Sequence, residues 1–394
     1  MRAQRVCGIA LVAVWLIGGR PVAAQDTIEL PDPTGTYAVG RTDYDLVDQS
    51  RDEIFTDDPA DKREILLSVY YPVAPAADAE TAPYMTETLR QAIARQDPSP
   101  IDEVAITSHA YRDQPVAKGV YPALIFLPGF GYPPVYYTSL LEEVASHGYV
   151  IAAVWPLYSA AAVEFPDGRI VLANEAGGKS DAMFEVWKGD ARFALDSLET
   201  FNREDGRFAG HLDLEHVGAF GHSFGGGTAG EFAYHDERVD AAISMDGGLF
   251  GESYLNGLAK PLLMMHSDVD LLVDLTSDEE FAAAQMTREG FEQQLAEGHA
   301  YEVRLMQIAH PGYDFTLKGS LHDAYTTDLL AVAVADGTLV DTKQIGTIDP
   351  RLAFELIRSY VVAFLDQGLK GTAGSLLQQP RSDSRVSFEI YNAD

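Results

Sequence analysis

One serine in this chain has the sequence context of a nucleophile. Ser223 lies in the segment Gly221-His-Ser-Phe-Gly225, which fits the pattern G-x-S-x-G. In that pattern the serine stands on a sharp turn between a strand and a helix, and the glycines leave room for the neighbouring backbone. Free N–H groups at the start of the helix favour a developing negative charge. An apolar strand before the turn and small residues after it favour this interpretation over an ordinary structural turn.

A serine hydroxyl is a poor nucleophile unless a neighbouring base takes its proton. We predict that His310 is this base, because it directly follows a strand expected over Tyr301–Ile308. His322, in a predicted loop twelve residues further along, is the alternative. His222 lies within the turn itself but points differently from Ser223, so we interpret it as structural.

Two carboxylates qualify as the acid that orients the histidine. Asp246 ends a predicted strand over Val239–Met245, and Asp270 follows the next predicted strand. The order Ser, acid, His is the one expected of an α/β-hydrolase, and it fits both candidates. Asp268, Asp270 and Asp274 also fit a calcium loop, but a solvated acidic run is the simpler interpretation.

An oxyanion in this site needs two N–H donors. We expect one from Phe224, directly after the serine, and one from Phe130, between Gly129 and Gly131 in the loop after a buried strand.

No metal or cofactor is expected. His211 and His216 are five residues apart, which matches neither helical spacing nor one face of a strand. The only cysteine, Cys7, lies in the N-terminal segment, so the mature chain has no thiol for a disulfide, a nucleophile or a metal ligand.

The apolar runs predict the elements that position these residues. Continuous runs at Pro122–Leu127 and Tyr149–Trp155 are typical of strands buried on both faces of a sheet. Helical periodicity follows several of the strands, for example over Asp181–Phe201 and Pro350–Asp366. Strands alternating with helices indicate an α/β fold, with a mostly parallel central sheet, helices on both faces and cap or loop insertions. We expect residues 25–394 to form one domain.

The chain of 394 residues is strongly acidic. It has 28 Lys and Arg against 60 Asp and Glu, a formal net charge of −32. Such a surface repels nucleic acids and anionic membranes, so neither is expected as a partner. Hydrophobic residues, at 46%, are sufficient for a large core.

Residues 1–24 have the features of a secretory signal peptide. Arg2 and Arg5 precede an apolar run over Cys7–Gly18, and small residues at Ala23 and Ala24 precede a cleavage point. The run is short for a spanning helix, so we predict a secreted or periplasmic protein without stable membrane insertion after cleavage.

Several segments resemble the platelet-activating factor acetylhydrolase family of secreted α/β-hydrolases, especially its bacterial members. The similarity covers most of the chain from Pro33 to Phe315. The segments that carry it are Pro33–Gly40, Val69–Pro72, Ser108–Pro115, Gly221–Gly226, Met245–Phe250 and Ala309–Phe315. The chain departs from the family at Leu127-Pro-Gly129, where Ser-His-Gly is usual.

The resemblance implies that Asp246 is the triad acid, and it supports His310 as the base. It also implies a serine esterase that acts on short acyl esters or on phospholipids related to platelet-activating factor. The partner is then a small-molecule or lipid ester. A broader carboxylesterase, lipase or polyesterase is the alternative within enzymes. A non-catalytic binding protein with a hydrolase fold is the alternative outside them.

Overall fold

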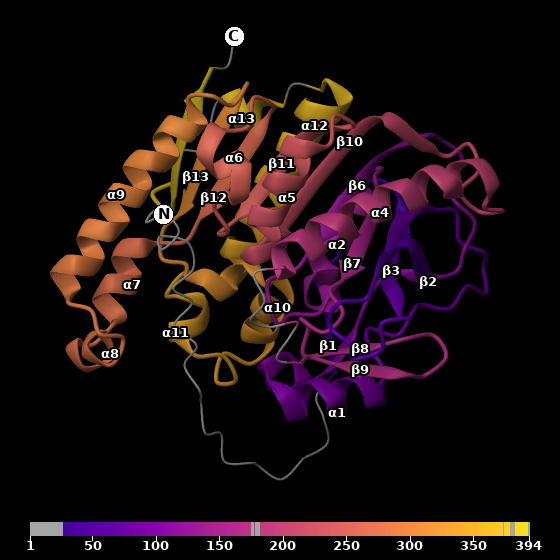
Figure 1. Cartoon of the computed structure of the whole chain (residues 1–394), viewed down its shortest axis with the longest axis horizontal. Helices are drawn as coiled ribbons and strands as arrows, with labels where there is room; N and C mark the ends of the chain where they lie inside the picture. The colour runs from indigo at the N-terminus through magenta and orange to yellow at the C-terminus, as the bar shows by residue number, and fades with distance from the viewer. Residues whose placement is uncertain (1–26, 175–176, 178–181, 373, 379–382, 393–394) are drawn as a thin grey trace.

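The computed structural model describes residues 27–174, 177, 182–372, 374–378 and 383–392 (Figure 1). The predicted signal peptide and Cys7 lie outside these described residues. In the described part of the chain, strands alternate with helices around one large sheet.

The centre of the sheet is β10 (Leu212–His222), which pairs with β6 (Tyr121–Leu127) on one side and β11 (Val239–Met245) on the other. Six neighbouring strands of this sheet, in the order β7, β6, β10, β11, β12 and β13, run parallel to one another, which confirms the predicted mostly parallel sheet. The sheet order is β14-β13-β12-β11-β10-β6-β7-β3-β2-β5. The other strands of this sheet are β2 (Ala38–Asp52), β3 (Lys62–Val73), β5 (Tyr111–Arg112), β7 (Val150–Trp155), β12 (Leu262–His266), β13 (Gly312–Leu317) and β14 (Val386–Tyr391).

The central strands are apolar throughout because both faces of the sheet are covered. Along β6, Leu124 and Phe126 pack into one core, and Ile125 and Leu127 pack into the other. Side chains alternate across a strand, so a strand between two cores needs apolar residues at every position.

Helices supply both layers. One face packs against α2 (Thr138–Ser146), α10 (Thr327–Ala335) and α12 (Pro350–Lys370). The other packs against α4 (Met183–Glu204) and α5 (Phe224–His235). The prediction of helices on both faces is therefore confirmed.

Insertions surround the carboxyl edge of the sheet. They include α1 (Glu87–Gln96), the hairpin of β8 (Ala162–Glu164) and β9 (Ile170–Leu172), α6 (Gly251–Asn256) and α11 (Thr342–Ile345). Three further helices, α7 (Val269–Leu275), α8 (Asp278–Ala283) and α9 (Arg288–Met306), lie together at one side of the molecule (Figure 1). No helix among the described residues combines the length and the apolar character needed to cross a bilayer.

The predicted strand over Tyr301–Ile308 is wrong. Residues up to Met306 belong to α9, and the strand β13 begins only at Gly312. The strand was predicted because Tyr301, Val303 and Leu305 alternate with charged residues, and such alternation is typical of a strand. In the helix, Leu305 and Met306 supply the buried contacts instead.

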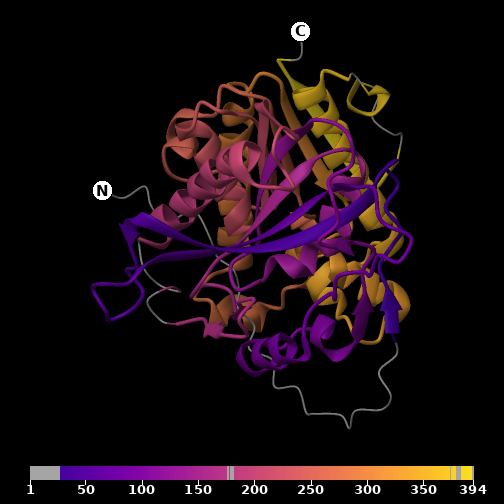
Figure 2. The same cartoon turned by 90° about the vertical axis from the view of Figure 1, so that its right-hand side faces the viewer.

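A buried ion-pair network ties the strand β3 to the helix α4. The Arg63 guanidinium bonds to Glu53 Oε2 at 2.8 Å, and it forms two bonds to the Asp190 carboxylate, one of them at 3.1 Å. All three side chains are no more than 3% exposed. The strands β2 and β3 form a long hairpin that extends across the face turned toward the viewer in Figure 2. Because Arg63 lies on β3 and Asp190 lies on α4, the network anchors this hairpin to the helical layer.

We expect Arg63→Ala to lower the free energy of unfolding by about 3–5 kcal/mol, because it leaves Glu53 buried without its counter-charge and leaves Asp190 paired with Arg51 alone. The neighbouring Lys62 pairs with Asp52 in the open, and Lys62→Ala is expected to cost less than about 1 kcal/mol. Urea denaturation of both variants is the measurement. Equal losses would contradict the assigned role of the network.

Candidate active site

Ser223 stands on the turn between β10 and α5 with φ 54° and ψ −125°, a conformation that side chains rarely adopt. Its amide donates to the Met245 carbonyl at 2.8 Å. A side chain at Gly221 would collide with the Leu127 carbonyl, and one at Gly225 would collide with the carbonyls of Leu127 and Pro128. The two glycines of the G-x-S-x-G pattern are therefore required by close backbone packing.

An imidazole lies directly against the Ser223 hydroxyl, and it belongs to His322. Its Nε2 is 2.9 Å from Ser223 Oγ, and its Nδ1 is 2.6 Å from Asp246 Oδ2. The three side chains thus form a continuous hydrogen-bonded line, in the arrangement that lets a serine lose its proton to a base held by an acid.

The expectation that His310 occupies this place is wrong. Its amide bonds to the Lys260 carbonyl, its side chain is exposed, and it precedes β13. His322 follows the carboxyl end of the same strand, at the start of a 3-10 turn over His322–Tyr325. Parallel strands share one carboxyl edge, so the shifted start of β13 places His310 at the opposite edge from Ser223.

Asp246 and Asp270 are in different surroundings. Asp246 follows β11 and accepts hydrogen bonds from the Ser267 amide at 2.7 Å and the Ser267 hydroxyl at 3.0 Å. Burial raises the pKa of Asp246, but the hydrogen bond to His322 and its charge outweigh burial and hold that pKa well below the usual range. Asp270 is largely exposed in the first turn of α7, with Lys318 as its ion-pair partner.

Ser267 is a functional contact that the sequence did not reveal. It follows the end of β12, and its only signal was this position at the carboxyl edge of the sheet. Asp268, one of the three aspartates of the calcium alternative, accepts the Gly319 amide and caps α7. Among the described residues, no group of three or more His, Cys, Asp or Glu side chains is arranged to hold a metal ion.

Desolvation lowers the pKa of His322, but the hydrogen bond and charge of Asp246, with a smaller contribution from Asp323, raise it above its usual value. The carboxylate therefore stabilises the imidazolium form, which is the form that appears when the ring accepts a proton.

Ser223 opens into a cleft of about 2290 Å³. The expected oxyanion residues Phe130 and Phe224 both line it. The rings of Phe184, Phe224 and Phe250 contact one another, with ring centroids 5.4–6.1 Å apart, and form an aromatic wall beside the serine. The cleft thus combines an apolar surface with the polar line of the three site residues.

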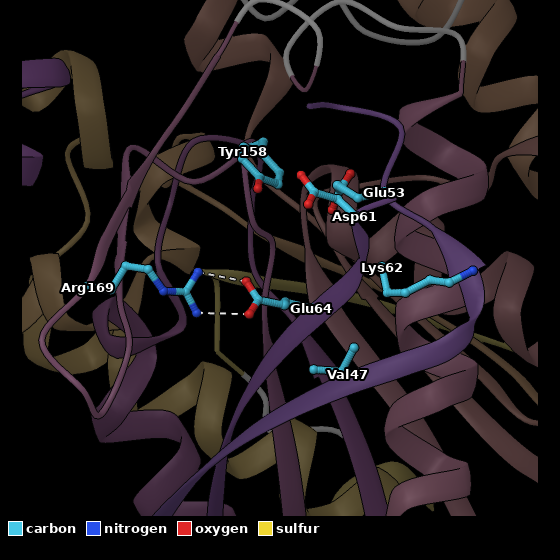
Figure 3. Close-up of a pocket in the computed structure, with 7 residues that line it drawn as sticks. All are labelled: Val47, Glu53, Asp61, Lys62, Glu64, Tyr158 and Arg169. Carbon is cyan, nitrogen blue, oxygen red and sulfur yellow. Dashed lines mark hydrogen bonds and ion pairs between the residues drawn. The ribbon is translucent and has the colours of Figure 1, made fainter. Parts of the chain in front are cut away.

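A second pocket shares no lining residue with this cleft. Figure 3 shows the residues that line it. Three of its charged groups are paired: Arg169 bonds to both oxygens of Glu64, and Glu53 belongs to the buried network with Arg63. His211 and His216, the other histidines considered for a metal, bond to the Gly119 carbonyl and to Asp213.

Comparison with known proteins gives concordant matches. Residues 184–375 match the family model of platelet-activating factor acetylhydrolase, isoform II, and residues 81–167 match the chlorophyllase model. The chain is 27% identical over 246 residues to a probable 1-alkyl-2-acetylglycerophosphocholine esterase of Arthroderma benhamiae, covering 58% of this chain and 61% of that protein. It is 25% identical over 277 residues to the platelet-activating factor acetylhydrolase of Cavia porcellus, covering 63% and 58%. These matches support a platelet-activating factor acetylhydrolase-like family for the chain.

The matched regions span only about three fifths of the length of these relatives. A solved structure gives wider coverage. The ferulic acid esterase from Streptomyces cinnamoneus has a TM-score of 0.73 and 27% identity, and the match covers 92% of this chain and 99% of that one. The predicted α/β-hydrolase fold is therefore confirmed, and so is the resemblance to the acetylhydrolase-like family.

The raised pKa of His322 predicts the pH dependence of ester hydrolysis. A base must be neutral, so we expect kcat/KM to increase with pH through a midpoint above the usual histidine value of about 6.5. Asp246→Asn should move the midpoint to lower pH and reduce kcat by about 10⁴-fold. The measurement is a pH–rate profile with a chromogenic acetyl ester. Asp270→Asn is the control, and equal losses in the two variants would contradict the assignment of the acid.

Proposed function

We propose that the chain is a serine esterase that hydrolyses carboxylic esters through an acyl-enzyme. The observation that carries this proposal is the hydrogen-bonded line from Ser223 through His322 to Asp246, with 2.9 Å between the hydroxyl and the imidazole. The names of the relatives, which include esterases and acetylhydrolases, support the same reaction class.

In the first half of the reaction, Ser223 Oγ attacks the ester carbonyl and His322 Nε2 takes its proton. The tetrahedral oxyanion accepts hydrogen bonds from the backbone N–H groups of Phe130 and Phe224. His322 then protonates the leaving alkoxide, and the acyl group stays on the serine. In the second half, water attacks the acyl-enzyme, its proton passes through His322, and the acid is released.

Throughout the cycle the Asp246 carboxylate holds His322 Nδ1 and stabilises the imidazolium. Ser267 keeps this carboxylate in place with two hydrogen bonds. Asp246 therefore remains ionised, and the proton moves only between the imidazole, the serine, the leaving group and water.

The substrate class we favour is short acyl esters or phospholipid esters related to platelet-activating factor, by analogy with two relatives, a probable 1-alkyl-2-acetylglycerophosphocholine esterase and a platelet-activating factor acetylhydrolase. A broader carboxylesterase is the second candidate. The large cleft and the similarity to a ferulic acid esterase over 92% of the chain favour it.

We also propose that the protein is secreted or periplasmic, because a signal-like segment precedes the described residues.

The nucleophile assignment predicts covalent labelling of one residue. A fluorophosphonate should modify Ser223 in the wild-type protein, and Ser223→Ala should neither be labelled nor retain more than about 10⁻³ of the turnover, since only the oxyanion donors and binding remain. Intact-mass and peptide mass spectrometry are the measurements. An unlabelled, folded wild-type protein would favour the non-catalytic alternative.

The two histidines provide a matched pair for the base. His322→Ala should reduce kcat by several orders of magnitude, about as much as Ser223→Ala, because the residues act as one unit. His310→Ala should retain activity within about twofold, because surface changes away from the site have small effects. Steady-state hydrolysis of a chromogenic ester checks both variants, and the reverse order would overturn the assignment of the base.

Substrate class is tested by acyl length. If the site is specific for short acyl groups, kcat/KM for p-nitrophenyl esters should fall at least about tenfold between acetyl and octanoyl, which corresponds to about 1.4 kcal/mol of transition-state binding. A flat or rising profile would favour the broader carboxylesterase.

A further inference from the structure

A buried hydroxyl joins the loop after β6 to the site histidines. Tyr137, at the end of the 3-10 turn Pro134–Tyr137, is fully buried. Its hydroxyl accepts the Gly129 amide at 3.1 Å and lies 2.8 Å from His222 Nδ1. Because the hydroxyl accepts the Gly129 N–H, its own proton is available for His222 Nδ1. The residue after Gly129 is Phe130, whose amide is the second oxyanion donor of the proposed mechanism.

The packing around Gly129 is tight on the same side. A side chain there would lie 3.2 Å from both His222 Nδ1 and the Tyr137 hydroxyl. The loop therefore lies directly against these two groups, one residue before the Phe130 amide.

His222 in turn lies against the proposed base. Its ring centroid is 4.6 Å from that of His322, and its side chain is completely buried. Burial, together with the charge of His322, lowers the pKa of His222 well below its usual value, so this ring stays neutral. A neutral ring can support His322 without repelling its imidazolium form.

A second contact from the same loop reaches the other side of the base. The Tyr132 hydroxyl donates to Asp323 Oδ1 at 3.0 Å, and Asp323 directly follows His322. The Tyr132 ring also stacks nearly parallel to His222, at 6.5 Å. Tyr132 and Tyr137 thus contact His222, which packs against His322, and Tyr132 also contacts Asp323, which follows His322 in the chain.

We propose that Tyr137 is a positioning residue. Its bond to the Gly129 amide holds the backbone that presents the Phe130 amide, and its bond to His222 holds the ring that packs against His322. The inference rests on the proposed esterase mechanism. Tyr137 itself touches neither the substrate nor the reacting atoms. It aligns the oxyanion donor and the base, so that both meet the same tetrahedral centre.

Tyr137→Phe removes the hydroxyl and keeps the ring. We expect kcat to fall about 10–100-fold, because a displacement of about 1 Å in a reacting group costs up to about 10²-fold. KM should change less than about twofold, since the apolar wall is untouched. The rate of covalent inactivation by a fluorophosphonate, which forms an oxyanion-like adduct on Ser223, should fall in parallel with kcat.

His222 variants separate positioning from general stability. In His222→Asn the side-chain amide oxygen takes the place of Nδ1 and still accepts the Tyr137 proton, so most of kcat should remain. His222→Leu should lose kcat about as far as Tyr137→Phe does, and the double variant should lose little more, because the two residues act as one unit. Additive losses, or equal losses in His222→Asn and His222→Leu, would overturn the proposal.

Tyr149→Phe is the matched control. Tyr149 is as buried as Tyr137, and its hydroxyl bonds to Asp366 at 2.9 Å on the α12 helix. This variant reports the cost of losing a tyrosine hydroxyl elsewhere, and we expect its kcat to be unchanged. Melting temperatures of all variants identify any that fail to fold.

Failure of the two proposals can be told apart. A wild-type protein that neither labels at Ser223 nor hydrolyses esters contradicts the proposed function. An active, labelled wild type whose Tyr137→Phe variant keeps full kcat contradicts only the positioning role.

Discussion

The close approach of the ends of β6 and β10 is the constraint on which the rest of the site depends. Gly221 and Gly225 flank Ser223 and pack against the carbonyls of Leu127 and Pro128, with no room for a side chain. This contact brings the loop after β6 next to the start of α5, where Phe130 and Phe224 lie. Because the contact is made of backbone, it holds the proposed oxyanion donors and the proposed nucleophile in one rigid unit.

The second constraint on the site is the buried charge of Asp246, which holds the imidazole that contacts Ser223. Asp246 is the group around which three elements meet: it follows β11, accepts two hydrogen bonds from Ser267 after β12, and holds His322 after β13. Each partner favours the ionised carboxylate, and that charge makes His322 a stronger base. The strands thus contribute one polar group each at their carboxyl ends.

The start of the loop after β6, Leu127-Pro-Gly129, carries no polar side chain of its own. The polar contact to this loop comes instead from Tyr137, which bonds to the Gly129 amide and to His222. A buried hydroxyl with two partners can fix a loop as firmly as a side chain within it, since the cost of leaving the partners unpaired is high.

The sequence by itself determined the parallel sheet and the G-x-S-x-G turn, because these depend on local patterns: apolar runs and the spacing of glycines around one serine. The preference for Asp246 over Asp270 came from the resemblance to the acetylhydrolase family, since the order of the residues along the chain fits both carboxylates. Only the tertiary structure decided which histidine lies beside Ser223. The alternation of Tyr301, Val303 and Leu305 imitates a strand, and buried contacts at one end made the segment a helix. That shift moved the start of β13 to Gly312, which put His310 at the far edge and His322 beside Ser223. The sequence also did not predict Ser267 as a partner of Asp246 or Tyr137 as a partner of His222. No local pattern encodes which strand ends and loops meet across a sheet.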